Sequence, residues 1–141
     1  MKPDEYADLL NLLLECERAG AKLLAAYIDE LPPGAGALEA LRDVQRDEAR
    51  NCAVLIHFLL EAGETPSAKT GDFYRKGLSI RGLGERLEFL NRGQAWVARR
   101  IADALPRMAA TPGRKALQDM YDSHLANIAR CDELQEGARA G

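Results

Sequence analysis

Three glutamates and one histidine fall on or beside the apolar face of segments that have a helical rhythm. Glu17 is followed about thirty residues later by Glu48, and Glu88 is followed at a similar interval by the region of His124. A carboxylate inside an apolar core needs a partner, a proton or a metal ion. Two glutamates and a histidine suit Fe(II), Mn(II) or Zn(II). We therefore take Glu17, Glu48, Glu88 and His124 as candidate metal ligands.

Further polar residues lie on the same faces as these candidates. They are amides and one phenol, which both donate and accept hydrogen bonds: Asn51, Asn91, Gln94 and Tyr121. Asn51 follows Glu48 by three positions, and Tyr121 precedes His124 by three positions. Both are secondary candidates, since an amide oxygen is a weak neutral ligand and a phenol binds well only when it is ionised. Each predicted helix contributes at least one polar residue, which predicts one shared site.

The elements that position these residues can be read from the apolar pattern. A 3.6-residue rhythm predicts helices at about 4–30, 37–62, 82–108 and 112–136. Pro32-Pro33-Gly34 ends the first helix, and Thr111-Pro112-Gly113 separates the last two. The segment at about 63–81 has no clear period and is long for a link between adjacent helices. We expect it to cross the length of a bundle, with a short helical turn around Phe73 and Tyr74.

The sequence therefore predicts an all-α fold, an up-down four-helix bundle. Two antiparallel helical hairpins are joined by a long crossover between the second and third helices. A chain of 141 residues is expected to form one domain, 1–141. The aromatic content of 6% and the abundance of Leu and Ala also favour helix.

This arrangement resembles the ferritin-like superfamily, most closely its small rubrerythrin-like bundles. The resemblance covers about residues 5–136 and implies a bundle of ferritin-like type. The glutamates of the family's metal-site pattern would fall on Glu17, Glu48 and Glu88, and its last histidine on His124. The resemblance also implies redox chemistry with peroxide or oxygen, or metal sequestration. Any redox activity would need an external reductant, because the cysteine-rich electron-transfer module of rubrerythrins is absent.

Two positions depart from the family's pattern. Asn51 stands where the pattern has its first histidine, and Tyr121 stands where it has its fourth glutamate. A pair of divalent ions uses four carboxylates and two imidazoles. A complete di-iron centre is therefore not expected, whereas a single iron, manganese or zinc ion is chemically possible.

Two other interpretations stay open beside the metal site. In one, the chain binds no metal and is a helical scaffold or protein-interaction module, in which the polar residues bond to one another. In the other, the same polar layer forms a binding pocket for a small molecule. Such bundles often pair through exposed helix faces, so we expect a homodimer, in which the partner is a second copy of this chain.

Several side chains compete for these roles. Glu15 would replace Glu17 if the first helix were rotated. Leu87 and Asn91 compete with Glu88 for the inward face of the third helix. His57 is half a turn out of phase with Glu48 and is predicted to point away from the site. The aromatic residues Phe89 and Trp96 fall on different faces, so we expect them to make core or dimer contacts.

Composition excludes some classes of partner. A net charge of −3 gives no reason to attract nucleic acid or anionic lipid. The acidic start of the chain does not fit a signal peptide, and the longest apolar run is too short to cross a bilayer. Three cysteines, Cys16, Cys52 and Cys131, cannot all pair and lack a C-x-x-C spacing. A cytoplasmic protein with reduced thiols is the expectation.

Overall fold

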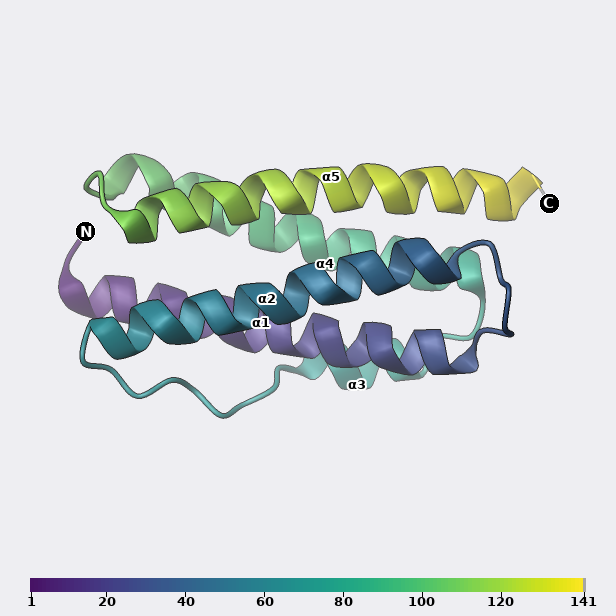
Figure 1. Cartoon of the computed structure of the whole chain (residues 1–141), viewed down its shortest axis with the longest axis horizontal. Coiled ribbons are helices and arrows are strands. Elements are labelled where there is room, and N and C mark those ends of the chain that lie inside the picture. The colour runs from purple at the N-terminus through teal and green to yellow at the C-terminus, as the bar shows by residue number, and fades with distance from the viewer. Residues whose placement is uncertain (141) are drawn as a thin grey trace.

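Four long helices form the up-down bundle that the apolar rhythm predicts. The computed structural model describes residues 1–140, with side chains described as far as residue 137. Its long helices are α1 (Pro3–Glu30), α2 (Leu38–Glu61), α4 (Leu83–Ala104) and α5 (Pro112–Ala140). The helices α1 and α2 form one antiparallel hairpin, and α4 and α5 form another (Figure 1). The described residues contain no β-strand, so the all-α prediction is confirmed.

Proline and glycine end the first hairpin's helices where the sequence predicts. Leu31 follows α1 in an extended conformation, because Pro32 cannot continue the helix. Gly34 has a φ of 82° in the turn between the helices. Gly63, just beyond α2, has a φ of 78°, a left-handed conformation that favours glycine at a helix C-terminus.

The turn of the second hairpin also depends on proline. The helix α4 ends at Ala104, earlier than predicted, and a 3₁₀ turn, Leu105–Arg107, follows it. Pro106 lies in this turn and has no N–H to continue the helical hydrogen bonds. At the start of α5, the Thr111 hydroxyl accepts a hydrogen bond of 3.2 Å from the Arg114 backbone N–H. Thr111 therefore caps the helix, as expected from its place before a proline.

The crossover runs back along the bundle beside α1 and carries the short helix α3 (Asp72–Leu78), as Figure 1 shows. This helix confirms the expected helical turn. The crossover is held by polar contacts with α1. The Ser67 hydroxyl donates to Glu15 Oε2 at 2.8 Å, and the buried Tyr27 hydroxyl donates to the Gly77 carbonyl at 2.8 Å. The second contact fixes α3 against the bundle.

The core consists of two apolar clusters, one towards each end of the bundle. The first includes Leu10, Leu13, Leu55, Ile101 and Leu117. The second includes Leu23, Leu24, Leu41, Leu87 and Leu90. Each fully buried leucine contributes about 2 kcal/mol through the hydrophobic effect. On each long helix the two sets of residues are separated in sequence by a buried polar residue. None of the described helices has the length and apolar character needed to span a membrane.

Candidate functional site

Several buried polar side chains lie between the two apolar clusters, and we call four of them, one from each long helix, the polar layer. They are Glu17 on α1, Glu48 on α2, Gln94 on α4 and His124 on α5, each between 1% and 4% exposed. The inward directions predicted for Glu17, Glu48 and His124 are confirmed. Gln94 was recognised in the sequence as a polar residue of the same layer but not as a site residue.

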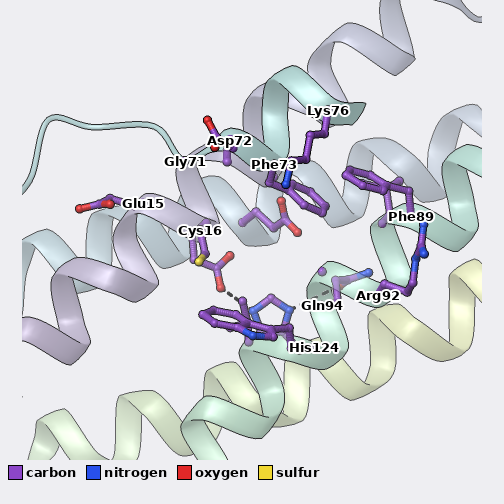
Figure 2. A pocket seen from close by; sticks show the side chains of 18 of the residues that line it. Glu15, Cys16, Gly71, Asp72, Phe73, Lys76, Phe89, Arg92, Gln94 and His124 are labelled. Atoms are coloured by element: carbon purple, nitrogen blue, oxygen red, sulfur yellow. Dashed lines mark hydrogen bonds and ion pairs between the residues drawn. The ribbon is translucent and has the colours of Figure 1, made fainter. Parts of the chain in front are cut away.

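His124 is held from both sides. Its Nε2 contacts Glu17 Oε1, and its Nδ1 lies 3.4 Å from Gln94 Oε1 (Figure 2). Burial alone would lower the pKa of His124. The charge of Glu17 and its hydrogen bond outweigh burial, with a smaller contribution from Asp47, and raise the pKa above its ordinary value of 6.5. A protonated imidazole would donate one hydrogen bond to Glu17 and one to Gln94.

Glu48 is in the opposite situation, because no described cation pairs with it. Burial raises its pKa well above the ordinary value of 4.5, and the charges of Glu17 and Asp47 raise it further. Glu48 Oε2 and Glu17 Oε2 are both buried without a hydrogen-bond partner. The polar layer thus holds two carboxyl groups and one imidazole, and burial favours the protonated form of Glu48.

The Glu48 carboxyl can lie in this place because Gly20 faces it. A Cβ atom on Gly20 would overlap the Glu48 carboxyl group. Glycine inside a helix costs about 1 kcal/mol relative to alanine. Glycine at position 20 therefore destabilises α1 but leaves room for the buried Glu48 carboxyl of α2.

A pocket of about 410 Å³ reaches the polar layer from the side where α1, α3 and α4 meet. All four polar-layer residues line it. Its walls are largely apolar and include Leu12, Phe73, Phe89, Leu90, Trp96 and Val97. Charged and exposed side chains of Asp72, Lys76 and Arg92 also border it. Phe89 packs against the second apolar cluster, as expected, and both Phe89 and Trp96 also line this pocket, which the sequence did not predict.

Glu88 does not join the site, and the prediction that it faces inward is wrong. The side chain is exposed on α4, whereas Leu87 is fully buried in the second apolar cluster. Successive residues of a helix are separated by about 100° around the axis, and Glu88 lies outside the inward arc that Leu87 and Leu90 occupy. The apolar side chain takes that place because burying it costs no desolvation of a charge.

The two secondary candidates lie outside the pocket. Asn51 is buried on α2, three residues beyond Glu48, but in the described part of the chain it is not among the pocket's lining residues. Tyr121 is half-buried and packs against the first apolar cluster. A residue that the sequence pattern did not single out, Asn127, is buried on α5 and donates to Asp47 at 3.3 Å.

The remaining candidates are placed as follows. Glu15 is half-buried and bonded to Ser67, so Glu17 and not Glu15 is the inward acid of α1. His57 is exposed beside Glu61, as predicted. Burial is the main cause that raises the pKa of each of the three cysteines to about 11, and all three are free thiols.

As the described side chains stand, no group of three or more histidine, cysteine, aspartate or glutamate residues is placed to hold a metal ion. Glu17 and His124 are in direct contact, and Glu48 lies on the same pocket without bonding to either. The arrangement can hold a proton on Glu48 and a charge pair beside it.

Comparison with known proteins identifies the family and the fold. Residues 4–133 match the family described as "Domain of unknown function (DUF6306)". The chain is also similar to a solved structure entitled "Crystal structure of ferritin like, diiron-carboxylate proteins from Bacillus anthracis str. Ames". The similarity covers 96% of this chain and 99% of that one, with 15% identity and a TM-score of 0.79. None of the curated proteins matches. At this identity the likeness establishes a ferritin-like fold and leaves the chemistry to the residues.

Proposed function

This chain belongs to the DUF6306 family, whose function is unknown, and from that premise we propose that it binds one divalent metal ion. The ligands would be Glu17, Glu48 and His124. The observation that carries the proposal is the pair of buried carboxylate oxygens, Glu17 Oε2 and Glu48 Oε2, without hydrogen-bond partners. Both residues line one pocket with a buried imidazole. A buried polar atom without a partner costs about 1–3 kcal/mol, which a cation would offset.

The residues of the polar layer fit a single ion. Two carboxylates neutralise a divalent charge, and the set of two glutamates and one histidine suits iron, manganese or zinc. His124 Nδ1 can donate to Gln94 Oε1, which would leave Nε2 free as a ligand atom. Hydrogen bonds of this kind commonly orient a metal-binding histidine and fix its tautomer. Gln94 is therefore the proposed positioning residue.

The same residues do not fit a pair of ions. Glu88 is exposed, and neither Asn51 nor Tyr121 lines the pocket in the described structure. A two-metal centre would need ligands at those positions. We therefore derive no step through a di-iron centre.

A single bound iron or manganese ion would supply one-electron redox chemistry, and zinc would supply a Lewis acid. The chain's own residues would orient and shield the ion. Glu48 would release its proton on binding, because a carboxylate ligand is ionised. The apolar walls of the pocket would limit the access of water. Redox activity with an external reductant and metal sequestration are the two uses that this chemistry supports.

Metal content of the purified protein tests the proposal. The full chain is produced without a histidine tag, and its metal is measured by elemental analysis alongside four variants. Glu48→Gln and His124→Gln remove proposed ligands, whereas Glu88→Gln and His57→Gln make the same changes at exposed positions. We expect about one metal ion per chain in the wild type and in both exposed-site variants, and a loss of at least tenfold in the other two. Equal metal content in all four variants would exclude the ligand assignment.

A metal-free polar layer is the second candidate, and one observation favours it. Both nitrogens of His124 already have partners, Glu17 and Gln94, so the imidazole is satisfied without an ion. In that case the chain would be a scaffold whose polar layer only specifies helix packing. Thermal unfolding distinguishes the two candidates. An ion at one hundred times its Kd stabilises the folded state by about 2.7 kcal/mol, whereas a scaffold melts at the same temperature with every divalent metal.

A further inference from the structure

We propose that the apolar part of the pocket binds a small aromatic molecule that carries one hydrogen-bond donor, such as a phenol. The ring would lie among the aromatic side chains of α3 and α4, and the donor would face the polar layer. This inference deepens the proposed function by naming the class of organic ligand held beside the ion-binding residues. It rests on the proposed function only in using the same pocket. The apolar walls of the pocket do not require a bound ion.

The first support is the concentration of aromatic side chains around the pocket. Only 6% of the chain is aromatic, yet two of its three phenylalanines and its single tryptophan line this one pocket. The rings of Phe73 and Phe89 stack with centroids 4.4 Å apart and an angle of 13° between their planes. Figure 2 shows both rings on the side of the pocket away from His124. Flat aromatic surfaces favour a ligand ring through stacked or edge contacts.

The second support is the chemistry at the base of the pocket. Glu17 Oε2 and Glu48 Oε2 have no hydrogen-bond partner, and the residues that carry them are at least 96% buried. A ligand hydroxyl would supply a donor to one of these oxygens. An apolar molecule without a donor would leave both oxygens unsatisfied, so the base of the pocket selects for a polar group at one end of the ligand.

The third support is the size and shape of the pocket. A volume of about 410 Å³ lies within the range of sites that hold small organic molecules. Two helix glycines make the shape possible. A Cβ atom on Gly93 would overlap the Phe73 ring, and one on Gly20 would overlap the Glu48 carboxyl. Glycine inside a helix is destabilising relative to alanine. Here the two glycines leave room for the Phe73 ring in the pocket wall and for the Glu48 carboxyl at its base.

The test uses 4-propylphenol as the probe and the fluorescence of Trp96, which is 40% exposed and lines the pocket. The full chain is titrated in the presence of a chelator, so that no metal ion is required. We expect saturable quenching by 4-propylphenol and at least fivefold weaker binding of propylbenzene, which lacks the hydroxyl. Absence of saturable quenching, or equal affinity for the two probes, would overturn the proposal.

Two matched substitutions locate the binding site. Leu12→Phe adds bulk to the pocket wall, and Leu134→Phe makes the same change at a half-buried position of α5 that does not line the pocket. We expect at least tenfold weaker binding in Leu12→Phe and less than twofold change in Leu134→Phe. Equal weakening in both variants would place the probe elsewhere and reject the proposal.

A second readout covers the case in which Leu12→Phe does not fold. Nuclear Overhauser contacts between the ring protons of 4-propylphenol and those of Phe73 and Phe89 in the wild type would support the proposal. Their absence at saturating probe would overturn it. The two proposals fail separately. A chain that binds metal but not the probe would contradict only this inference, and a chain that binds the probe but no metal would contradict only the proposed function.

Discussion

The two hairpins of the bundle contribute different chemistry to the same layer. The α1–α2 hairpin supplies both buried carboxyl groups, Glu17 and Glu48. The α4–α5 hairpin supplies a neutral amide, Gln94, and an imidazole, His124, while its own glutamate, Glu88, is exposed. The halves match in helix arrangement but not in charge.

This difference explains why the layer needs both hairpins. Two carboxyl groups buried by the first hairpin would repel each other, and the imidazole of the second hairpin pairs with one of them. The other acid, Glu48, has only a proton to neutralise it in the protein alone. A cation that enters the pocket can replace the exchangeable proton on this buried acid.

The largest expected effect comes from removing the second hairpin's imidazole. His124→Leu leaves the acids of the first hairpin without a cationic partner, and we expect a loss of about 3 kcal/mol in the free energy of unfolding. Urea denaturation of the metal-free chain measures it. The matched change at the exposed histidine, His57→Leu, should cost less than about 0.5 kcal/mol. Equal stability of His124→Leu and the wild type would contradict the pairing.

A smaller effect is expected from filling the space beside Glu48. Gly20→Ala places a methyl group on the Glu48 carboxyl, and we expect a loss of about 2 kcal/mol as the acid is displaced. The matched change in the second hairpin is Gly84→Ala, where an added Cβ atom meets nothing within 4 Å. That variant should be more stable than the wild type by about 0.5 kcal/mol. Thermal unfolding that ranks the two variants in the opposite order would refute this account of Gly20.

The pH dependence of stability reports the protons held by Glu48 of the first hairpin and His124 of the second. Both Glu48 and His124 have a raised pKa in the folded state, so both bind protons more tightly when folded. The stabilisation from Glu48 is fully present below pH 4.5, and that from His124 is fully present below pH 6.5. Each is lost as the pH rises through the raised pKa of the folded state.

Metal-free protein should therefore melt at a lower temperature at pH 9 than at pH 6. Glu48→Gln keeps a neutral side chain at every pH and should show a smaller decline. A wild type that melts at a constant or rising temperature over this range would contradict the assignment of these protons.

The smallest effect is expected at the acid that the site does not use. Glu88→Gln alters only an exposed side chain, and the free energy of unfolding should change by less than about 0.5 kcal/mol. Urea denaturation beside Glu48→Gln gives the comparison. A cost at Glu88 as large as that at Glu48 would mean that both hairpins bury an acid.

The helices and the crossover could be predicted because their signals are local. Pro32 and Pro112 stand at helix boundaries, and Gly63 ends α2. The apolar stripes of α1, α2 and α5 place Glu17, Glu48 and His124 inward. On α4 the predicted stripe left Leu87 and Glu88 as neighbouring alternatives, and there the prediction chose the wrong polar residue.

The errors concern features that local sequence does not encode. Glu88 and Leu87 are neighbours, and only packing against the second apolar cluster decides which one is buried. A pocket at the polar layer is one interpretation of the sequence, but its apolar walls could not be predicted because they come from three elements. Phe73 on α3 meets Phe89 and Gly93 on α4 only after the crossover has folded back over the bundle.

The most direct test of the central claim is a crystal structure of the full chain grown with Mn(II), with anomalous difference maps recorded at a wavelength where manganese scatters. We expect one anomalous peak, within bonding distance of Glu17, Glu48 and His124. A map without a peak in the polar layer, from crystals in which His124 still contacts Glu17 directly, would contradict it.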